Sequence, residues 1–404
     1  MKRMRGCNQL RILIISKQYP PTIGGGGSHA FYLARELSLH KNVEVHVLTS
    51  TVKEKPHFER IKGRNLTVYR VDFGHTETFP YEGAMRKGLE LCQQIKPHIL
   101  HGQHIGGAFL GLHIKTAFKK PLVVTLHKTP MLNWDPTKIK DEPLYTFIKL
   151  LSRMETIDAF IAGSKVFRKE LLKFGVSKDK VKLIYHGIPI KWFKNMAYDS
   201  NRVSSVVAKL NLRQNDNLII CPSRLDEKRK EIDIFVKAAG LLKQRIPEKN
   251  FVFLITGTAR NQKESNYIEY LKNIASSSNI RDCLRFESFV LEEIPALNQL
   301  AKACVLPSIA EGLGLVLIEA LAVRTPVIGS NTHGIREVIR THGKQGLRFE
   351  VGNHEELGNH LVKLFTDNNL LNRLKREGFK RVKKHFDAGL MVDKHLEIYR
   401  ALRR

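Results

Sequence analysis

The chain has 404 residues, of which 42% are apolar and 26% are charged. These values are typical of a folded globular protein and exclude a collagen-like or disordered chain. There are 67 Lys and Arg residues against 39 Asp and Glu, which gives a formal net charge of +28. This excess favours an anionic partner, such as a polyanion, an anionic membrane surface or a phosphorylated ligand.

The cysteines and the apolar stretches indicate the cellular compartment of the protein. The five cysteines show no C-x-x-C spacing, so the sequence predicts neither a disulfide framework nor a zinc site. No secretory signal is visible at the N-terminus. The longest apolar stretch, 315–323, is interrupted by Glu319 and is far shorter than the ~20 residues that cross a bilayer. We expect a cytoplasmic protein, with peripheral contact to the inner face of the membrane as a further hypothesis.

Short apolar runs alternate with helical patterns along the whole chain. In the first half the predicted strands are residues 11–16, 43–49, 66–71, 99–101, 122–127, 159–162 and 181–185. In the second half they are residues 218–222, 251–256, 284–289, 304–307, 327–330 and 346–349. Most runs are continuous in Val, Ile and Leu, which is typical of strands covered on both faces. The alternation predicts an α/β fold with parallel, doubly wound, Rossmann-like sheets.

Polar turn residues divide the chain. We predict an N-terminal domain over residues 1–195, a linker over 196–217 and a C-terminal domain over 218–385. Residues 373–404 are basic and helix-periodic, and we predict a C-terminal helix over residues 386–404. We expect this C-terminal helix to pack back on the N-terminal domain.

The first half of the chain contains two candidate binding features, a glycine run and a histidine, and each follows a predicted strand. A glycine run that includes Gly24 and Gly25 comes shortly after the first strand and just before a helix. Glycines let a backbone approach a ligand closely, and helix N-termini attract anions, so this run could hold a phosphate. His127 ends a buried strand, where it could bond a sugar hydroxyl or a phosphate, or shuttle a proton.

A basic motif opens the second half. Arg224 lies at the end of the predicted strand 218–222, and Lys228, Arg229 and Lys230 precede a helical pattern. Cations that converge on one point fit a diphosphate, whose negative charge must be neutralised as it departs.

The sharpest motif pairs two carboxylates. Glu311 and Glu319 are separated by seven residues, and Gly312 and Gly314 lie between them. If a helix begins at Leu313, Glu311 lies just before it and Glu319 about two turns inside it, on the same side. Carboxylates accept hydrogen bonds from hydroxyls, including a ribose diol, and the N–H groups of the opening turn can bind phosphate or sugar oxygens.

Together these motifs resemble the GT-B glycosyltransferases of the large retaining family 4. The resemblance rests on Pro20-Pro21 with Gly24-Gly25, on His127, on Arg224 with Lys230, and on Glu311 with Glu319. It runs through nearly the whole chain, and the basic motif looks especially like that of phosphatidylinositol mannosyltransferases. His186 departs from the family pattern, which often has Asn there.

The resemblance implies two Rossmann-like domains that face each other across a cleft, and it implies a role for each motif. Gly24 and Gly25 approach the donor diphosphate or the acceptor, and His127 lies beside the transferred sugar. Arg224 and Lys230 bind the leaving group, Glu311 holds the sugar hydroxyls and Glu319 the ribose. The predicted catalytic residues are thus His127, Arg224, Lys230 and Glu311. The predicted donor-binding residues are Gly24, Gly25, Gly312, Leu313, Gly314, Leu315, Val316 and Glu319.

The implied reaction is transfer of a hexosyl unit from a UDP- or GDP-sugar to a lipid, glycan or small-molecule acceptor, with retention of configuration. The sequence contains no Asp-x-Asp, so we expect no metal and no cofactor. Two alternatives remain open: another GT-B nucleotide-sugar enzyme, such as an epimerase or a sugar-phosphate synthase, and a basic nucleic-acid-binding protein. The second is disfavoured because stacking aromatics, a helix-turn-helix signal and zinc spacing are missing, so we expect no nucleic-acid partner.

Overall fold

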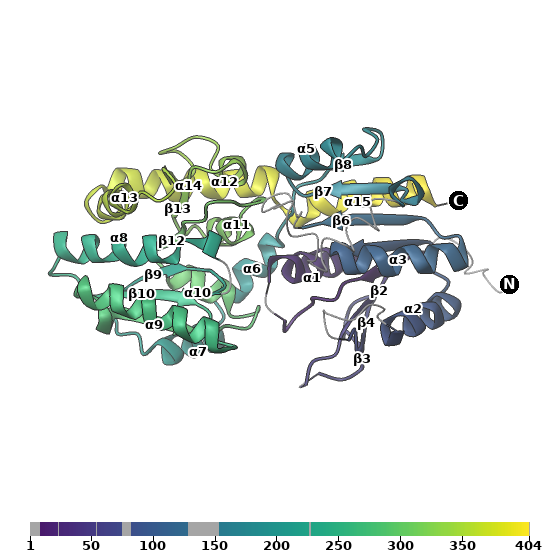
Figure 1. The fold of residues 1–404 in the computed structure, drawn as a ribbon, viewed down its shortest axis with the longest axis horizontal. Helices are drawn as coiled ribbons and strands as arrows, with labels where there is room; N and C mark the ends of the chain where they lie inside the picture. Colours follow the sequence, from purple (N-terminus) through teal and green to yellow (C-terminus); the bar gives the residue numbers. More distant parts are fainter. Residues whose placement is uncertain are drawn as a thin grey trace. The chain divides into compact units, whose positions relative to one another are not determined.

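The structure is a computed structural model that describes residues 9–22, 24–53, 55–74, 82–127, 153–225 and 228–403. Parts of three predicted motifs, Ile23, 128–130 and 226–227, lie outside these residues. The chain divides into two compact units (Figure 1). Unit 1 comprises Met1–Gly187 and Ala388–Arg404, and unit 2 comprises Ile188–Asp387.

The described part of unit 1 forms an eight-stranded sheet in the order β3-β4-β2-β1-β5-β6-β7-β8. Its strands are β1 (Leu10–Ile15), β2 (Val43–Ser50), β3 (Phe58–Arg60), β4 (Leu66–Val71), β5 (Ile99–Gln103), β6 (Leu122–Leu126), β7 (Ala159–Ala162) and β8 (Val181–Leu183). All neighbours are parallel except β3, which pairs antiparallel with β4 at the edge. Because β2 and β5 both flank β1, the winding direction reverses between β1 and β5. Ligands of open α/β sheets bind at such a switch point.

Helices cover both faces of the unit 1 sheet, which explains why its strands are continuous in apolar residues. On one face α2 (Glu82–Ile95), α3 (His104–Phe118) and α5 (Lys165–Lys173) contribute to one apolar core. On the other face α1 (Gly25–Leu37) and α15 (Ala388–Leu402) contribute to a second core. A 3-10 turn, η2 (Met154–Thr156), precedes β7. The C-terminal segment therefore packs in unit 1, where Tyr399 is fully buried.

Unit 2 contains a six-stranded parallel sheet in the order β11-β10-β9-β12-β13-β14. The strands are β9 (Asn217–Cys221), β10 (Phe251–Thr256), β11 (Leu284–Glu287), β12 (Ala303–Leu306), β13 (Val327–Ser330) and β14 (Leu347–Phe349). The chain winds outward from β9 to β11, returns to β12 beside β9 and then winds the other way. The switch point of unit 2 therefore lies between β9 and β12.

Figure 1 shows the helices of unit 2 on both sides of its sheet. They are α6 (Ile190–Ala197), α7 (Ser200–Leu210), α8 (Ile232–Arg245), α9 (Gln262–Ser277), α10 (Ile294–Leu300), α11 (Leu315–Ala322), α12 (His333–Val338), α13 (His354–Thr366) and α14 (Asn368–His385), with the 3-10 turns η3 (Lys228–Lys230) and η4 (Arg281–Cys283). Helices α8, α9 and α13 supply much of the core on one face. None of the helices in the described ranges is both long and apolar enough to cross a membrane.

Three local predictions differ from the structure. Residues 196–217, predicted as a linker, form part of unit 2: α7 spans half of them and buries Val206 and Leu210. The glycine run, predicted to come just before a helix, lies mostly inside it, since α1 begins at Gly25. Helix α11 begins at Leu315 rather than Leu313, so Glu319 lies only about one turn inside it.

Candidate active site

In unit 2 the predicted basic and acidic motifs follow the two strands that flank the switch point. Arg224 lies in the loop after β9, half-buried, and Lys230 ends the 3-10 turn η3 in the same connection. Glu311 lies in the loop after β12, which leads into α11. Since β9 and β12 are parallel neighbours, both loops leave the sheet at the same edge.

Lys230 and Glu311 form an ion pair across this edge. Lys230 Nζ donates to Glu311 Oε1, and each side chain is only 12% exposed. Arg229 adds a second cation, with its Nη1 3.6 Å from Glu311 Oε1. Ser308 Oγ donates to the same carboxylate oxygen at 3.1 Å. One carboxylate oxygen is therefore held by two cations and a hydroxyl.

These partners keep Glu311 ionised. Burial raises the pKa of Glu311, but the charges of Lys230 and Arg229 and the hydrogen bonds from Lys230 and Ser308 more than offset it, so the pKa lies below its usual value. An ionised carboxylate only accepts hydrogen bonds, which suits a ligand rich in hydroxyl groups.

The backbone beside Glu311 is held by tight glycine packing. Gly314 caps α11 with a φ of +83°, a left-handed conformation that glycine adopts without strain. A Cβ on Gly334 would lie 2.2 Å from the carbonyl oxygen of Glu311, so α12 approaches this loop as closely as a glycine allows. Glu319 lies in the same α11 helix and is 6% exposed.

Of the predicted residues in unit 2, the structure brings Lys230 and Glu311 into direct contact. Gly312, Leu313, Gly314, Leu315 and Val316 follow Glu311 through the loop and into α11. Sequence reasoning missed Arg229 and Ser308 as members of this cluster. Arg229 also fixes the loop, because its Nη1 donates to the Ala310 carbonyl at 2.6 Å and its own carbonyl accepts from the Ile309 N–H at 2.8 Å.

The predicted residues of unit 1 lie at the carboxyl edge of its own sheet. Gly24 precedes α1 and Gly25 is the first residue of that helix. A Cβ on the next residue, Gly26, would lie 1.8 Å from Nε2 of His104, so the glycine leaves the space that this imidazole fills. His104 itself opens α3 directly after β5, with a left-handed φ of +59° that is uncommon for residues other than glycine.

His127 directly follows β6 and both of its ring nitrogens are bonded within unit 1. Its Nε2 lies 2.7 Å from Gln103 Oε1, and its Nδ1 lies 3.1 Å from His186 Nε2. Burial, followed by the neighbouring His104, His186 and His101, lowers the pKa of His127 well below its usual value. His127 is therefore a neutral imidazole at physiological pH.

His127 belongs to a cluster of histidines that the sequence motifs did not reveal. Its ring centroid lies 4.4 Å from that of His104 and 4.8 Å from those of His29 and His186. His29 and His186 lie 4.0 Å apart. Burial, then the charges of His395 and His104, lowers the pKa of His186 to about 3. Burial, followed by the neighbouring His186 and His127, also lowers the pKa of His29 well below its usual value. His29, His127 and His186 are therefore uncharged near neutral pH.

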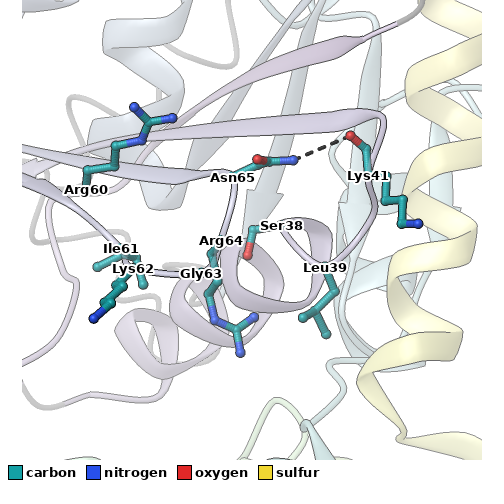
Figure 2. A pocket seen from close by; sticks show the side chains of 9 residues that line it. All are labelled: Ser38, Leu39, Lys41, Arg60, Ile61, Lys62, Gly63, Arg64 and Asn65. Carbon is teal, nitrogen blue, oxygen red and sulfur yellow. Dashed lines mark hydrogen bonds between the residues drawn. The ribbon is translucent and has the colours of Figure 1, made fainter.

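No group of three or more His, Cys, Asp or Glu side chains is arranged to hold a metal ion in the part of the chain that the structure describes. One surface hollow of about 600 Å³ lies in unit 1 (Figure 2). Its cationic lining residues are Lys41, Arg60, Lys62 and Arg64. Figure 2 shows that their charged ends point in different directions, so they do not converge on one ligand.

Comparison with protein families finds a match in each unit. Residues 23–192 match the model of Glycosyltransferase Family 4. Residues 205–381 match the model of Glycosyl transferases group 1. The two matches cover the candidate residues of both units.

Individual relatives span nearly the whole chain. An uncharacterised glycosyltransferase of Methanocaldococcus jannaschii is 27% identical over 82% of this chain and 83% of its own. The mannosylfructose-phosphate synthase of Agrobacterium fabrum is 25% identical over 90% of this chain and 83% of its own. Among solved structures, HepE of Anabaena in complex with UDP and glucose matches with a TM-score of 0.76 and 17% identity, over 97% of this chain and 100% of that one.

Proposed function

Because the chain belongs to the GT-B glycosyltransferases of family 4, we propose that it transfers a hexosyl unit from a UDP- or GDP-sugar to an acceptor hydroxyl, with retention of configuration and without a metal. The observation that carries this proposal is the Lys230–Glu311 ion pair, with Arg229 beside it, at the switch point of unit 2. It combines cations that can bind an anionic leaving group with a carboxylate that can accept hydrogen bonds from sugar hydroxyls.

In this proposal the donor diphosphate binds to Arg224 and Lys230. Negative charge builds up on the diphosphate as the glycosidic bond breaks, and fixed cations stabilise that charge without reorganisation. The diphosphate competes with Glu311 for Lys230, and this frees the carboxylate to accept hydrogen bonds from the sugar hydroxyls. Glu319 binds the ribose diol, and the backbone of residues 312–316 contacts the donor.

In this proposal Arg224, Arg229 and Lys230 supply the charge that a divalent ion would otherwise provide. The relative HepE was solved with UDP and glucose, which supports a UDP-sugar as the donor. In unit 1, the proposal places His127 beside the transferred sugar, and Gly24 and Gly25 beside the diphosphate or the acceptor.

For the acceptor we favour a phosphorylated small molecule over a neutral glycan or a lipid. The mannosylfructose-phosphate synthase of Agrobacterium fabrum is named for a phosphorylated product. A protein with a net charge of +28 attracts anionic substrates over long range.

The decisive experiment is a thermal-shift panel of UDP-, GDP- and ADP-sugars on the full chain. A donor at ~100 times its dissociation constant should stabilise the fold by ~2.7 kcal/mol. Turnover is then measured with sugar phosphates as acceptors, with and without EDTA, and the anomeric configuration of the product is read by NMR. A product of inverted configuration, or activity abolished by EDTA and restored by a divalent cation, would contradict the proposal.

A peripheral membrane contact is a separate proposal, supported by the basic stretch at and after α5. Its cationic residues are Lys165, Arg168, Lys169, Lys173, Lys178, Lys180 and Lys182. The apolar residues Phe167 and Leu171 of α5 are buried in unit 1, so the contact would be electrostatic rather than insertive. Co-sedimentation with vesicles containing anionic lipid, but not with neutral vesicles, is the expected result, and indifference to lipid charge would exclude this contact.

A further inference from the structure

A chain of buried hydrogen bonds crosses unit 1 from the C-terminal helix to His127. Tyr399 Oη of α15 lies 2.6 Å from His101 Nδ1, and His101 Nε2 lies 3.1 Å from Gln103 Nε2. Gln103 Oε1 lies 2.7 Å from His127 Nε2, and His127 Nδ1 lies 3.1 Å from His186 Nε2. Four of the five side chains are buried and His127 is half-buried, so water does not compete for most of these bonds.

Gln103 gives this chain a direction, because an amide nitrogen only donates and an amide oxygen only accepts. His101 Nε2 has two polar neighbours, Gln103 Nε2 at 3.1 Å and Thr125 Oγ1 at 2.8 Å. In the observed orientation the Gln103 N–H donates to His101 Nε2, and the Thr125 hydroxyl, which can donate or accept, donates to the same nitrogen. The proton of the neutral His101 ring then lies on Nδ1 and is donated to Tyr399. The Gln103 oxygen accepts from His127 Nε2–H. The remaining nitrogen of His127, Nδ1, is then an acceptor and receives a hydrogen bond from His186 Nε2–H.

We propose that Gln103 and His186 are positioning residues that fix the ring orientation and the tautomer of His127. This inference rests on the proposed function, in which His127 lies beside the transferred sugar. Its consequence is that His127 offers an acceptor, Nδ1, to a sugar hydroxyl. Before the donor binds, the His186 N–H holds Nδ1 in place as an acceptor. The sugar hydroxyl then replaces this N–H, while the bond to Gln103 keeps the proton on Nε2.

The surroundings of His127 support a single neutral tautomer. In the part of unit 1 that the structure describes, the titratable groups that face it are histidines: His29 from α1, His101 from β5, His104 from α3 and His186 after β8. None of these side chains offers a carboxylate that would stabilise an imidazolium. The proton position on His127 is therefore set by hydrogen bonds rather than by a charge.

Gly163 shows how closely His186 is held. A Cβ on Gly163 would lie 2.2 Å from His186 Cε1 and 2.4 Å from His186 Nε2. A Gly163→Ala substitution therefore displaces the donor of the His127 bond without changing any member of the hydrogen-bonded chain.

The first test uses steady-state kinetics. We expect His186→Leu, Gln103→Met and Gly163→Ala to lower kcat by about 10- to 100-fold, since small misplacements of a group at a reacting centre have effects of this size. His186→Gln keeps an N–H near the position of Nε2 and should restore most of the activity. His113→Gln serves as the control, because His113 is a half-buried histidine of α3 that bonds only to the Phe109 carbonyl among the contacts described. The donor affinity of each variant, measured by titration calorimetry, should stay within about twofold of the wild-type value.

The second test does not depend on turnover. Ring 15N shifts of the histidine-labelled full chain report which nitrogen of His127 carries the proton, with His127→Asn used only to assign the signal. We expect Nε2–H in the wild type, and a mixture of tautomers in Gln103→Met. The opposite tautomer in the wild type would overturn the inference, as would wild-type kcat in both Gln103→Met and His186→Leu.

The two tests separate the inference from the proposed function. If His127→Ala transfers sugar as fast as the wild type, His127 has no role in transfer and the functional proposal fails at that residue, whatever the NMR shows. If His127→Ala is inactive while the Gln103 and His186 variants keep full activity and the same tautomer, only the positioning inference fails.

Discussion

Replacing Lys230 by Met tests the central ion pair of unit 2. Methionine keeps the length of the side chain and removes its charge, so Glu311 loses its nearest cation while the packing is largely retained. Arg229 remains, with its Nη1 3.6 Å from Glu311 Oε1.

The magnitude follows from this remaining cation. At an effective dielectric constant of 20, two unit charges 3.6 Å apart interact by about 4–5 kcal/mol before desolvation is counted. Removing one partner of a buried pair usually costs about 3–5 kcal/mol, because the other charge is left unpaired. Since Arg229 still faces Glu311, we expect Lys230→Met to lower the free energy of unfolding by only about 1–3 kcal/mol. We expect kcat to fall on the order of 10²-fold, because the variant removes one fixed cation from the leaving group.

The double variant Lys230→Met/Glu311→Gln separates stability from activity. It removes both charges, so unfolding by urea should show stability recovered toward the wild-type value, while turnover stays low. Lys237→Met is the matched control, because Lys237 pairs with Asp233 at 3.3 Å on the surface of α8 and should change the free energy of unfolding by less than about 0.5 kcal/mol. Wild-type turnover in Lys230→Met would refute the leaving-group assignment. A double variant less stable than either single variant would refute the account of the ion pair.

Two further predictions concern packing and pH. Gly334→Ala should lower donor affinity by about tenfold or more, as measured by calorimetry. The new Cβ would lie 2.2 Å from the Glu311 carbonyl oxygen and push the loop away from the donor. Unchanged affinity would show that this loop does not contact the donor. Burial, with the charges of His395 and His104, lowers the pKa of His186 to about 3, and burial lowers the pKa of His395 to about 4, so both bind protons more readily in the unfolded chain than in the folded one. The free energy of unfolding should therefore be highest above about pH 6.5–7 and should fall as the pH drops, by about 2 kcal/mol for each of the two histidines at pH 5. Urea unfolding that is insensitive to pH between 7 and 5 would contradict a neutral cluster.

The main features of the unit 2 site could be predicted from the sequence because its groups lie close to strand ends. Arg224 and Lys230 follow one strand, Glu311 follows another, and in a doubly wound sheet these ends meet at the switch point. The direct contact between Lys230 and Glu311 and the part played by Arg229 could not be predicted. They depend on how the 3-10 turn η3 orients its side chains, which has no signature in residue spacing.

The start of α11 was misplaced by two residues for a local reason. Gly314 adopts a φ of +83°, so the helix begins only after it. A glycine is compatible both with the first turn of a helix and with a left-handed cap, and the sequence alone does not distinguish them. Likewise the run Gly25 to Gly27 forms the first turn of α1, although glycine is a poor helix former. Within this turn Gly26 leaves room for His104, and Gly27 lies against Gln18.

The histidine cluster of unit 1 was largely invisible in the sequence. His29, His104, His127 and His186 come from four different connections of one sheet. Each of them follows the carboxyl end of a strand, and this shared position was the one signal that could have united them. A parallel sheet brings such positions to one edge however far apart they lie in the chain.

The candidate residues of unit 2 are charged, whereas those of unit 1 include neutral imidazoles, and this difference supports the different roles proposed for the two units. Unit 2 collects charges, and in the proposed reaction its cations stabilise the departing diphosphate, which is an anion. Unit 1 collects imidazoles whose pKa values are lowered by burial and by one another, so that they stay neutral. Next to a sugar that gains positive charge as its bond breaks, an imidazolium would raise the barrier, whereas a neutral ring can still bond a hydroxyl. The cluster therefore has the electrostatic character that the proposed reaction requires beside the sugar. If the proposal is right, a variant that charges His127, such as Gln103→Glu, should slow transfer more than a variant that only removes its hydrogen bond.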